Sequence, residues 1–508
     1  MDRSDRRTLR RARLRPFFLF HFFLGLGAVA GFFSANSLLI GSFGPSLLFH
    51  AYLCQGVLTV LLSAIFYFLA DRLRKDVFPS VWFSLLGALV LGSWALLQWG
   101  PDRAGVVLGV RSLFDAVAIA SSLGFWLMVG DRFSPRGAKA RYSGLMAAYI
   151  LGDMAGGLLL ERTAGVVSGA DFILLWGLLL AASPLAFRGI FRGNPAPADP
   201  APAAASRPSP GATGVFKPLS LVLFAFWLIY SFFSDATDYL FNAAASDRWT
   251  DEDALAAYFG KVALFANAGI LGYHLLLSKR VLKRFGVDLT AALIPVLIAA
   301  SWTLAYARPS LATLSLAQGL VYFFLDYFAI AHLHIPLTVF SRSARGRVKA
   351  FTEGFGRACG FILLFGVAGC FSFRPEFSDL GRIVFLGALA FLAFPAVFRF
   401  VYLKHLLEAL RAKDSRVVLN AVFGLSERGK ARAEPFLVAL YRRSRRRRLK
   451  RAIVRCFGRM RSTAGMQAVL SDFAACDRPL RTTILQVCRE WEGSASLSAA
   501  QWRIYGNI

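Results

Sequence analysis

Residues 6–33 read RRTLRRARLRPFFLFHFFLGLGAVAGFF, a cluster of arginines followed directly by an uninterrupted apolar stretch. About twelve such stretches of about 20 residues, long enough for a hydrocarbon core about 30 Å thick, follow one another along the chain. Every second gap between them is rich in Lys and Arg. Because basic loops stay on the cytoplasmic side of a membrane, the pattern predicts a multi-pass protein with an even number of spans and two cytoplasmic termini.

The gaps that alternate with these basic gaps are short, as at 42–46, or contain acidic residues, as at 247–253. The basic gaps beyond the tail contain Arg72, Arg74, Lys75, Arg132, Arg136, Lys139, Arg141, Arg188, Arg192, Lys279, Arg280, Lys283, Arg284, Arg342, Arg345 and Arg347.

The composition fits a membrane protein. The 508 residues are 56% apolar and only 17% charged, and the mean hydropathy is +0.53. The formal charge of +28 lies mostly at the cytoplasmic ends of spans, where it sets orientation and meets anionic lipid headgroups; a nucleic-acid partner is not expected. The first stretch has no small-residue cleavage site and is interpreted as a retained span, with a bacterial inner membrane as the favoured location.

The sequence contains no signature of a cofactor or of an enzyme. No Walker A loop, catalytic triad or metalloprotease helix is found, which disfavours an ATP-hydrolysing pump. The cysteines have no CxxC spacing, so disulfides and zinc are not expected. They are Cys54, Cys359, Cys370, Cys456, Cys476 and Cys488.

We predict an all-α protein with two six-helix halves, a layout typical of transporters that are built from two pseudo-symmetric halves. A Pro/Ala-rich cytoplasmic linker (191–217) separates the N-terminal bundle (16–190) from the C-terminal bundle (218–402), and a basic cytoplasmic tail (1–15) precedes both. The predicted spans are 16–33, 47–70, 78–99, 106–129, 142–160, 172–187, 219–241, 255–277, 289–306, 311–330, 349–371 and 381–401.

The remaining residues, 403–508, have no apolar run of span length. Their apolar residues recur at helical spacing, in stripes around Val418, Ile453 and Ile484. Short helix pairs at intervals of about 30–35 residues predict a cytoplasmic α-solenoid of HEAT type. An arginine-rich run at 442–451 crosses one predicted turn, and it fits either a solvated face near anionic lipid or a docking site for an acidic partner.

Ionisable groups inside spans usually line a polar cavity and are therefore candidate site residues. Asp235, Asp238 and Asn242 lie at i, i+3 and i+7 in the seventh span and share one helical face. They fit a substrate-facing wall. The alternative is that Asp238 and Asn242 lie at the outer water boundary and cap the next loop.

The eleventh span begins with Arg347 and continues with Lys349, Glu353 and Arg357 at i, i+4 and i+8. This spacing predicts a ladder of cation, anion and cation on one face. The ladder could bind an anionic substrate or act as an interhelical latch at the cytoplasmic gate. Glycines at 354, 356 and 360 leave room for another helix or for a ligand.

Single acids in other spans are candidates for proton or cation coupling: Asp115, Asp153 and Asp326. The glycines around Asp153 also argue for tight helix packing. His332 and His334 are too close in sequence for a zinc pair on a helix, and we interpret them as interfacial residues or weak pH sensors.

Three segments resemble the non-mitochondrial ATP/ADP antiporters, the nucleotide transporters of plastids and intracellular bacteria, and above all the bacterial relatives with C-terminal HEAT repeats. They comprise Phe125-Trp126 with Asp131, Arg132, Phe133, Arg136, Lys139 and Arg141; Asp238–Asn242 with Asp251–Asp253, Phe259 and Gly260; and Arg345–Gly354. The resemblance implies a major-facilitator fold whose charged intramembrane residues, the Lys349/Glu353 pair among them, hold and exchange a triphosphate. Where the exchangers have a lysine in the first span, this chain has only Ser34, Asn36 and Ser37.

The leading hypothesis is a secondary transporter that moves an organic anion, for example a nucleotide such as ATP or ADP, by alternating access. The first alternative is a transport-inactive membrane scaffold whose HEAT-like domain recruits a cytoplasmic protein. The second alternative is a proton-coupled exporter, for which Asp115 and Asp153 would matter more than the basic ladder.

Overall fold

The computed structural model describes residues 15–74, 76–100, 103–132, 135–163, 166–193, 215–249, 251–371, 377–412, 414–425 and 433–492. The predicted basic tail and most of the predicted linker lie outside these residues. Within them, all regular secondary structure is helical, as the sequence predicts.

The N-terminal half contains six long helices. They are α2 (Arg15–Phe43), α3 (Leu48–Arg72), α4 (Phe78–Trp99), α5 (Ala104–Arg132), α6 (Pro135–Thr163) and α7 (Gly169–Gly193), with a short helix η1 (Pro45–Leu47) between α2 and α3. Prolines occupy the first turns of η1 and α4, where a missing backbone N–H costs nothing.

The C-terminal half is more interrupted. It contains α8 (Pro218–Ser246), α9 (Glu252–Gly272), α10 (Ser278–Ala307), α11 (Leu311–Gln318), α12 (Leu325–Leu337), α13 (Arg342–Lys349), α14 (Gly356–Gly369), α15 (Phe377–Phe391) and α16 (Phe394–Ala409). Three π-helical turns lie between these helices: η3 (Tyr273–Leu277), η4 (Gly319–Phe324) and η5 (Ala350–Phe355). Such turns inside helices are frequent at functional sites.

The helices have the length and apolarity needed to cross a membrane. Among the described residues, ten helices qualify singly, and α15 with α16 forms a further pass that is bent by 40°. Pro395 in the first turn of α16 accounts for the break, since proline cannot donate to the preceding turn. Helix α10 has 30 residues, of which 291–307 form an apolar stretch shorter than the other passes, and it packs against α15 and α16. The predicted total of twelve passes stays a prediction.

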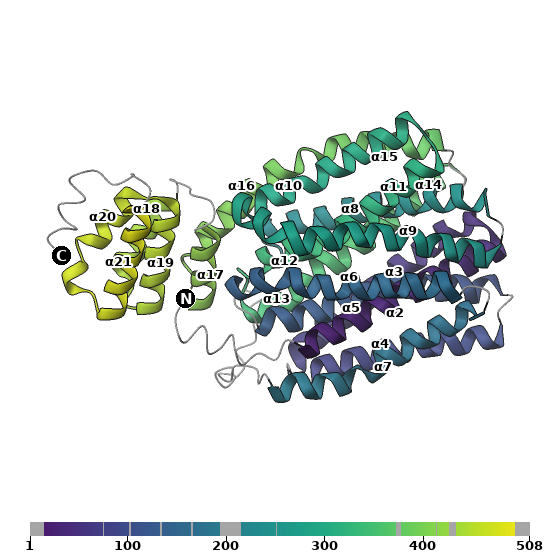
Figure 1. Ribbon diagram of the computed structural model, residues 1–508, viewed down its shortest axis with the longest axis horizontal. Helices are drawn as coiled ribbons and strands as arrows, with labels where there is room; N and C mark the ends of the chain where they lie inside the picture. Colours follow the sequence, from purple (N-terminus) through teal and green to yellow (C-terminus); the bar gives the residue numbers. More distant parts are fainter. Residues whose placement is uncertain are drawn as a thin grey trace.

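Figure 1 shows these helices running lengthwise in one bundle, with α4 and α7 along one side and α10 and α15 along the opposite side. The two halves meet where α2, α3 and α6 contact α9 and α14. We term the end of the bundle at which α2 begins, at Arg15, the inner end, and the end at which α2 and α8 finish, at Phe43 and Ser246, the outer end.

Glycines allow close approach of helices where the sequence predicts it. A Cβ at Gly152 would lie 1.9 Å from the Phe22 carbonyl oxygen, so α6 and α2 touch through their backbones beside Asp153. A Cβ at Gly360 would lie 2.5 Å from the Leu228 carbonyl oxygen. Gly356 and Gly360 therefore admit helix α8, whereas a Cβ at Gly354 would meet the Ser63 side chain of α3. At all three positions the neighbour is another helix.

Helices α17 (Ser415–Leu425), α18 (Glu434–Arg443), α19 (Arg447–Met460), α20 (Thr463–Leu470) and α21 (Arg478–Glu492), with the short η7 (Phe473–Ala475), follow the bundle. Figure 1 shows α18–α21 beyond one end of it. Helix α19 packs against α17, α18, α20 and α21. Helix α16 continues past the predicted boundary at 403 to Ala409, and its Leu406 is buried; the domain boundary itself stays a prediction. The assignment of these helices to HEAT repeats stays a prediction.

Candidate functional site

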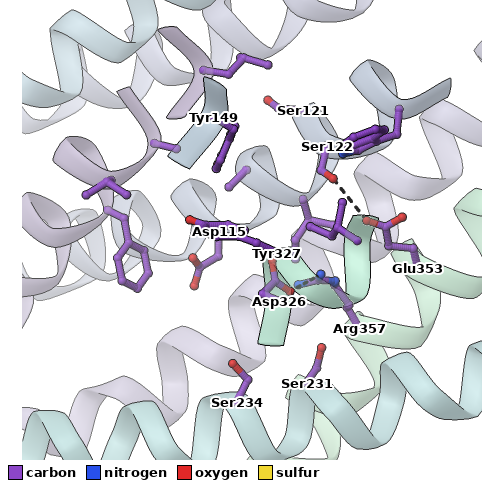
Figure 2. Close-up of a pocket in the computed structure, with 18 of the residues that line it drawn as sticks. Asp115, Ser121, Ser122, Tyr149, Ser231, Ser234, Asp326, Tyr327, Glu353 and Arg357 are labelled. Atoms are coloured by element: carbon purple, nitrogen blue, oxygen red, sulfur yellow. Dashed lines mark hydrogen bonds and ion pairs between the residues drawn. The ribbon is translucent and has the colours of Figure 1, made fainter. Parts of the chain in front are cut away.

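A polar cavity lies between the two halves, bordered by α2, α3, α5, α6 and α7 on one side and by α8, α12, η5 and α14 on the other. The centres of water molecules can occupy about 130 Å³ of it, which is roughly ten times the space that one water needs. Among the described residues, its charged lining consists of Asp115, Asp235, Asp326, Glu353 and Arg357. Most of them are labelled in Figure 2.

Glu353 occupies the inner side of the cavity within the π-helical turn η5. The Lys349 ammonium group donates to its Oε2 atom at 2.7 Å, and the His334 Nε2 atom lies 2.9 Å from the same oxygen. Ser122, on α5 of the other half, donates to the Glu353 Oε1 atom at 3.4 Å. The carboxylate of Glu353 thus links both halves and is fully paired inside the protein.

Arg357 lies near mid-depth, about 22 Å along the helix from Arg342 at 1.5 Å per residue. Its guanidinium donates to Asp326 at 2.5 Å and lies 4.2 Å from the centre of the Trp227 ring. The predicted ladder therefore divides into two ion pairs. Lys349 pairs with Glu353, whereas Arg357 is held by a carboxylate from a different span.

A second polar network, which we call the outer latch, is centred on Arg111 of α5. Arg111 is seven residues beyond Ala104, the first residue of α5, so it lies about 10 Å from the outer end of that helix. Arg111 is fully buried. Its side chain bonds to Asp115 at 2.6 Å and to Asn36 at 2.8 Å within the N-terminal half, and lies 3.7 Å from Asp238 of the C-terminal half. The ring of Phe32 faces the guanidinium at 4.4 Å.

Further hydrogen bonds of the outer latch cross between the halves. Tyr52 donates to Asp238 at 2.9 Å, and Asn36 donates to Asn242 at 3.0 Å. Gln318 donates to the second oxygen of Asp238 at 2.7 Å. Asp238 and Asn242 are buried in this network, so the alternative that they cap a loop at the water boundary is wrong.

A single residue, Arg345, forms what we call the inner latch. Its guanidinium donates to the carbonyl of Gly130 at 2.9 Å, near the end of α5, and to the carbonyls of Thr338 and Phe340 beyond α12. Gly130 belongs to the N-terminal half and Arg345 to the C-terminal half. The two latches thus lie on opposite sides of the cavity.

Asp153 forms a further polar contact between the halves. It is completely buried on α6 and accepts a hydrogen bond from Tyr327, which lines the cavity. Its other oxygen, Oδ1, has no hydrogen-bond partner among the described residues. None of the described ion pairs includes Asp153.

Asp235 lines the cavity and is only 4% exposed. Its Oδ2 atom is buried without a hydrogen-bond partner in the part of the chain that the structure describes. The other three carboxyl groups of the lining each bond to a cation: Asp115 to Arg111, Asp326 to Arg357 and Glu353 to Lys349. Among the described lining residues, Asp235 is therefore the one acid without an ion pair to a basic side chain.

The structure separates the remaining candidates from the cavity. Arg347 is half-buried and does not belong to the lining. The sequence analysis interprets His332 and His334 as interfacial residues or weak pH sensors, but both are buried. His332 stacks on Phe328, and His334 bonds to Lys349 and Glu353. Arg132, Arg136, Lys139 and Arg141 have side chains outside the described part.

Sequence reasoning missed Arg111 as a site residue. It is a cation inside the predicted span 106–129, and its i, i+4 spacing to Asp115 is the signal that could have identified it. Arg345 was assigned to a basic gap and to a segment of the family resemblance, but not to the site. Tyr52, Gln318 and Tyr327 carry no signal in a single sequence, because tyrosine and glutamine are ordinary residues of spans.

Comparison with known proteins extends these observations to the fold. No family model and no curated protein matches the chain. Among solved structures, a bacterial homologue of the iron transporter ferroportin, outward-facing with soaked iron, is similar over 77% of this chain and 99% of its own at 16% identity, with a TM-score of 0.54. The same homologue in its outward-facing state is similar at 15% identity over 75% and 99%, with a TM-score of 0.50.

The human organic anion transporter MFSD10 (TETRAN) is similar at 16% identity over 78% of this chain and 99% of its own, with a TM-score of 0.47. At these identities the first two likenesses carry the fold alone. The resemblance to nucleotide exchangers thus stays a prediction. The chain is a multi-pass membrane protein that shares the fold of the bacterial ferroportin homologue.

Proposed function

We propose that the protein is a secondary active transporter that works by alternating access between its two six-helix halves. The observation that carries the proposal is the pair of latches on opposite sides of a charged central cavity. In the outer latch Arg111 faces Asp238, and in the inner latch Arg345 holds the carbonyl of Gly130. Opening one latch while the other stays closed would expose the cavity to one side of the membrane at a time.

Accessibility of a cavity residue tests this proposal without knowledge of the substrate. Ser121 lines the cavity from α5, and its hydroxyl has no partner among the described residues. A cysteine at this position (Ser121→Cys) should react with a membrane-impermeant maleimide from either side, in right-side-out and inside-out vesicles. Reaction from one side only would refute alternating access.

A reducible crosslink across the outer latch sharpens the test. Asn36 and Asn242 are in hydrogen-bond contact at 3.0 Å, so a short bis-methanethiosulfonate reagent should join the two thiols of Asn36→Cys with Asn242→Cys and lock the outer side. Labelling of Ser121→Cys from outside should then be lost and should return on reduction, while labelling from inside persists. The two single-cysteine variants are the controls. A locked protein that is still labelled from outside would contradict the assignment of this network as a gate.

The charges around the cavity favour proton coupling. Arg111, Lys349 and Arg357 each already bond to a carboxylate, whereas Asp153 and Asp235 have no cationic partner among the described residues. A carboxyl group without a partner is costly to bury in its charged form, and it can take up a proton when the cavity closes. Of the predicted coupling candidates Asp115, Asp153 and Asp326, Asp153 therefore fits this role best, because the other two bond to arginines.

Besides a coupled proton, the transporter could carry an organic anion, including a nucleotide, as its substrate. The observation that favours it is Arg357, which lines the cavity and could exchange Asp326 for a carboxylate or phosphate of the substrate. Lys349 would similarly have to release Glu353. Exchange of radiolabelled ATP by proteoliposomes, abolished in the double variant Lys349→Ala with Glu353→Gln, would support this candidate. Absence of exchange by the unmodified protein would remove it.

We also propose an inner-membrane location with both termini in the cytoplasm, and two partners for the C-terminal helices. Arg442, Arg443 and Arg445–Arg448 are exposed around the turn between α18 and α19, which suits anionic lipid headgroups. An acidic cytoplasmic protein is the alternative partner, and it is the function that a transport-inactive scaffold would keep. Capture of such a protein by a chain that never exposes Ser121→Cys to both sides would favour the scaffold.

A further inference from the structure

We propose that the central cavity binds a small organic cation with an apolar body, such as an amine or a quaternary ammonium compound, and that Asp235 is its counter-ion. This inference rests on the proposed transport function, in which the central cavity receives the substrate, and it names the chemical class of that substrate.

The first argument is the balance of charge. Among the described lining residues, four carboxyl groups face one guanidinium group. Asp115, Asp326 and Glu353 are neutralised by cations at 2.5–2.7 Å, and only one of these cations, Arg357, belongs to the lining. An entering anion would therefore have to break an existing ion pair. A cation has to break none.

The second argument is the state of Asp235. Its side chain is more than nine-tenths buried, faces the cavity, and leaves its Oδ2 atom without a hydrogen-bond partner among the described residues. An unpaired buried charge is strongly unfavourable, and a partner of opposite charge with hydrogen bonds offsets that cost. A bound cation would supply this missing partner.

The polar groups next to Asp235 suit an ammonium group. Ser231 and Ser234 lie on the same helix, α8, and both line the cavity. Figure 2 shows their hydroxyl groups pointing toward the side of the cavity where Asp326 and Arg357 lie. Hydroxyl oxygens can accept hydrogen bonds from an amine, and they can also face a quaternary ammonium group.

The aromatic lining suits the apolar body and adds to cation recognition. Phe33, Trp126, Tyr149, Trp176 and Phe361 all border the cavity. The faces of aromatic rings attract cations within about 6 Å, an interaction that strengthens when water is excluded. Phe32 already shows this geometry inside the protein, with the Arg111 guanidinium 4.4 Å from its ring centre. Aromatic rings around a free carboxylate are typical of sites for organic cations.

Two probes of matched shape and opposite charge test the inference: phenyltrimethylammonium and benzenesulfonate. Each is titrated into the purified full-length protein by isothermal titration calorimetry. We expect phenyltrimethylammonium to bind and benzenesulfonate not to bind. Asp235→Asn, which keeps the size of the side chain, should weaken binding of the cation at least tenfold. Asp171→Asn removes the same charge from an exposed site at the start of α7 and should leave the affinity unchanged.

The inference is overturned if benzenesulfonate is the probe that binds, if neither probe binds, or if Asp235→Asn binds the cation as well as the unmodified protein does. Failure of the transport proposal looks different. Cation binding that depends on Asp235, in a chain whose Ser121→Cys is reached from one side only, would keep the binding site and refute alternating access. Labelling of Ser121→Cys from both sides together with benzenesulfonate binding would support alternating access and refute the cation site.

Discussion

The outer latch gives the sharpest prediction, because Arg111 bonds to one acid of its own helix and faces one acid of the other half. Asp238→Asn removes the charge pair that crosses between the halves, at 3.7 Å. Asp115→Asn removes a charge pair within α5, at 2.6 Å. Both variants replace a buried aspartate by asparagine, and Asp238→Asn also disturbs the hydrogen bonds that Tyr52 and Gln318 donate. The variants differ in whether contacts between the halves are lost.

The size of the effect follows from Coulomb's law. Two unit charges 3.7 Å apart attract by about 4 kcal/mol at an effective dielectric constant of about 20. Dehydration of both ions offsets part of this attraction. A net latch energy of about 1.4 kcal/mol corresponds to a tenfold change in the outward-open population. We therefore expect Asp238→Asn to raise that population tenfold or more, and Asp115→Asn to leave it unchanged or lower it.

The assay is the rate at which an impermeant maleimide labels Ser121→Cys from outside, in a variant that lacks Cys54, Cys359 and Cys370. The other three cysteines are buried in the C-terminal helices. Asp238→Asn should be labelled about ten times faster than its parent. Equal rates for Asp238→Asn and Asp115→Asn would show that Arg111 only stabilises α5, and the assignment of a gate would fall.

Three further predictions concern the stability and the topology of the protein. Lys349→Ala leaves Glu353 buried without its main partner and should destabilise the protein by about 3–5 kcal/mol. Adding Glu353→Gln should restore most of the melting temperature. A double variant as unstable as the single variant would contradict this explanation. Gly152→Ala, whose Cβ would lie 1.9 Å from the Phe22 carbonyl oxygen, should lower the melting temperature, whereas Gly366→Ala, with nothing within 4 Å, should not. Cys370 is exposed beyond the outer end of α14 and should react with an impermeant maleimide on intact cells, while Cys456, whose pKa burial raises to about 12, should stay unlabelled at pH 7. Labelling of Cys370 only after permeabilisation would reverse the proposed orientation.

Hydropathy predicts the passes well because apolar length is a local property of the sequence. The ends of the passes are less predictable, and the first span shows why. The predicted span ends at residue 33, whereas α2 continues to Phe43. Ser34, Asn36 and Ser37 end the apolar run, yet all three are buried, since Asn36 bonds to Arg111 and Asn242. Polar residues that face a partner inside the protein resemble, in sequence, residues that face water.

The candidate site was predictable in its acids and less so in its pairings. Isolated charges within apolar runs, such as Asp235 and Glu353, stand out in the sequence, and both line the cavity. Their partners depend on tertiary contacts between distant spans. Arg357 fits a helical ladder with Glu353 by spacing alone, but Asp326 of another span takes its guanidinium. Spacing along one helix cannot show such a competitor.

The two latches differ in kind, and this difference bears on which gate opens more readily. The outer latch joins two charged side chains, so neutralising Asp238 can release it. The inner latch joins the Arg345 guanidinium to carbonyl oxygens near the ends of α5 and α12, where helix ends leave carbonyls unsatisfied and carry partial negative charge. Such carbonyls cannot be neutralised by a proton.

The inner latch also has a support outside the bundle. Asn420 of α17 donates to the Thr338 carbonyl at 2.6 Å, the same oxygen that Arg345 contacts at 3.3 Å. The first helix after the last span therefore holds the loop between α12 and α13 in the position that Arg345 needs. Because a protonation event can weaken the outer contact but not the inner one, a proton arriving from outside would open the cavity toward the side from which it came.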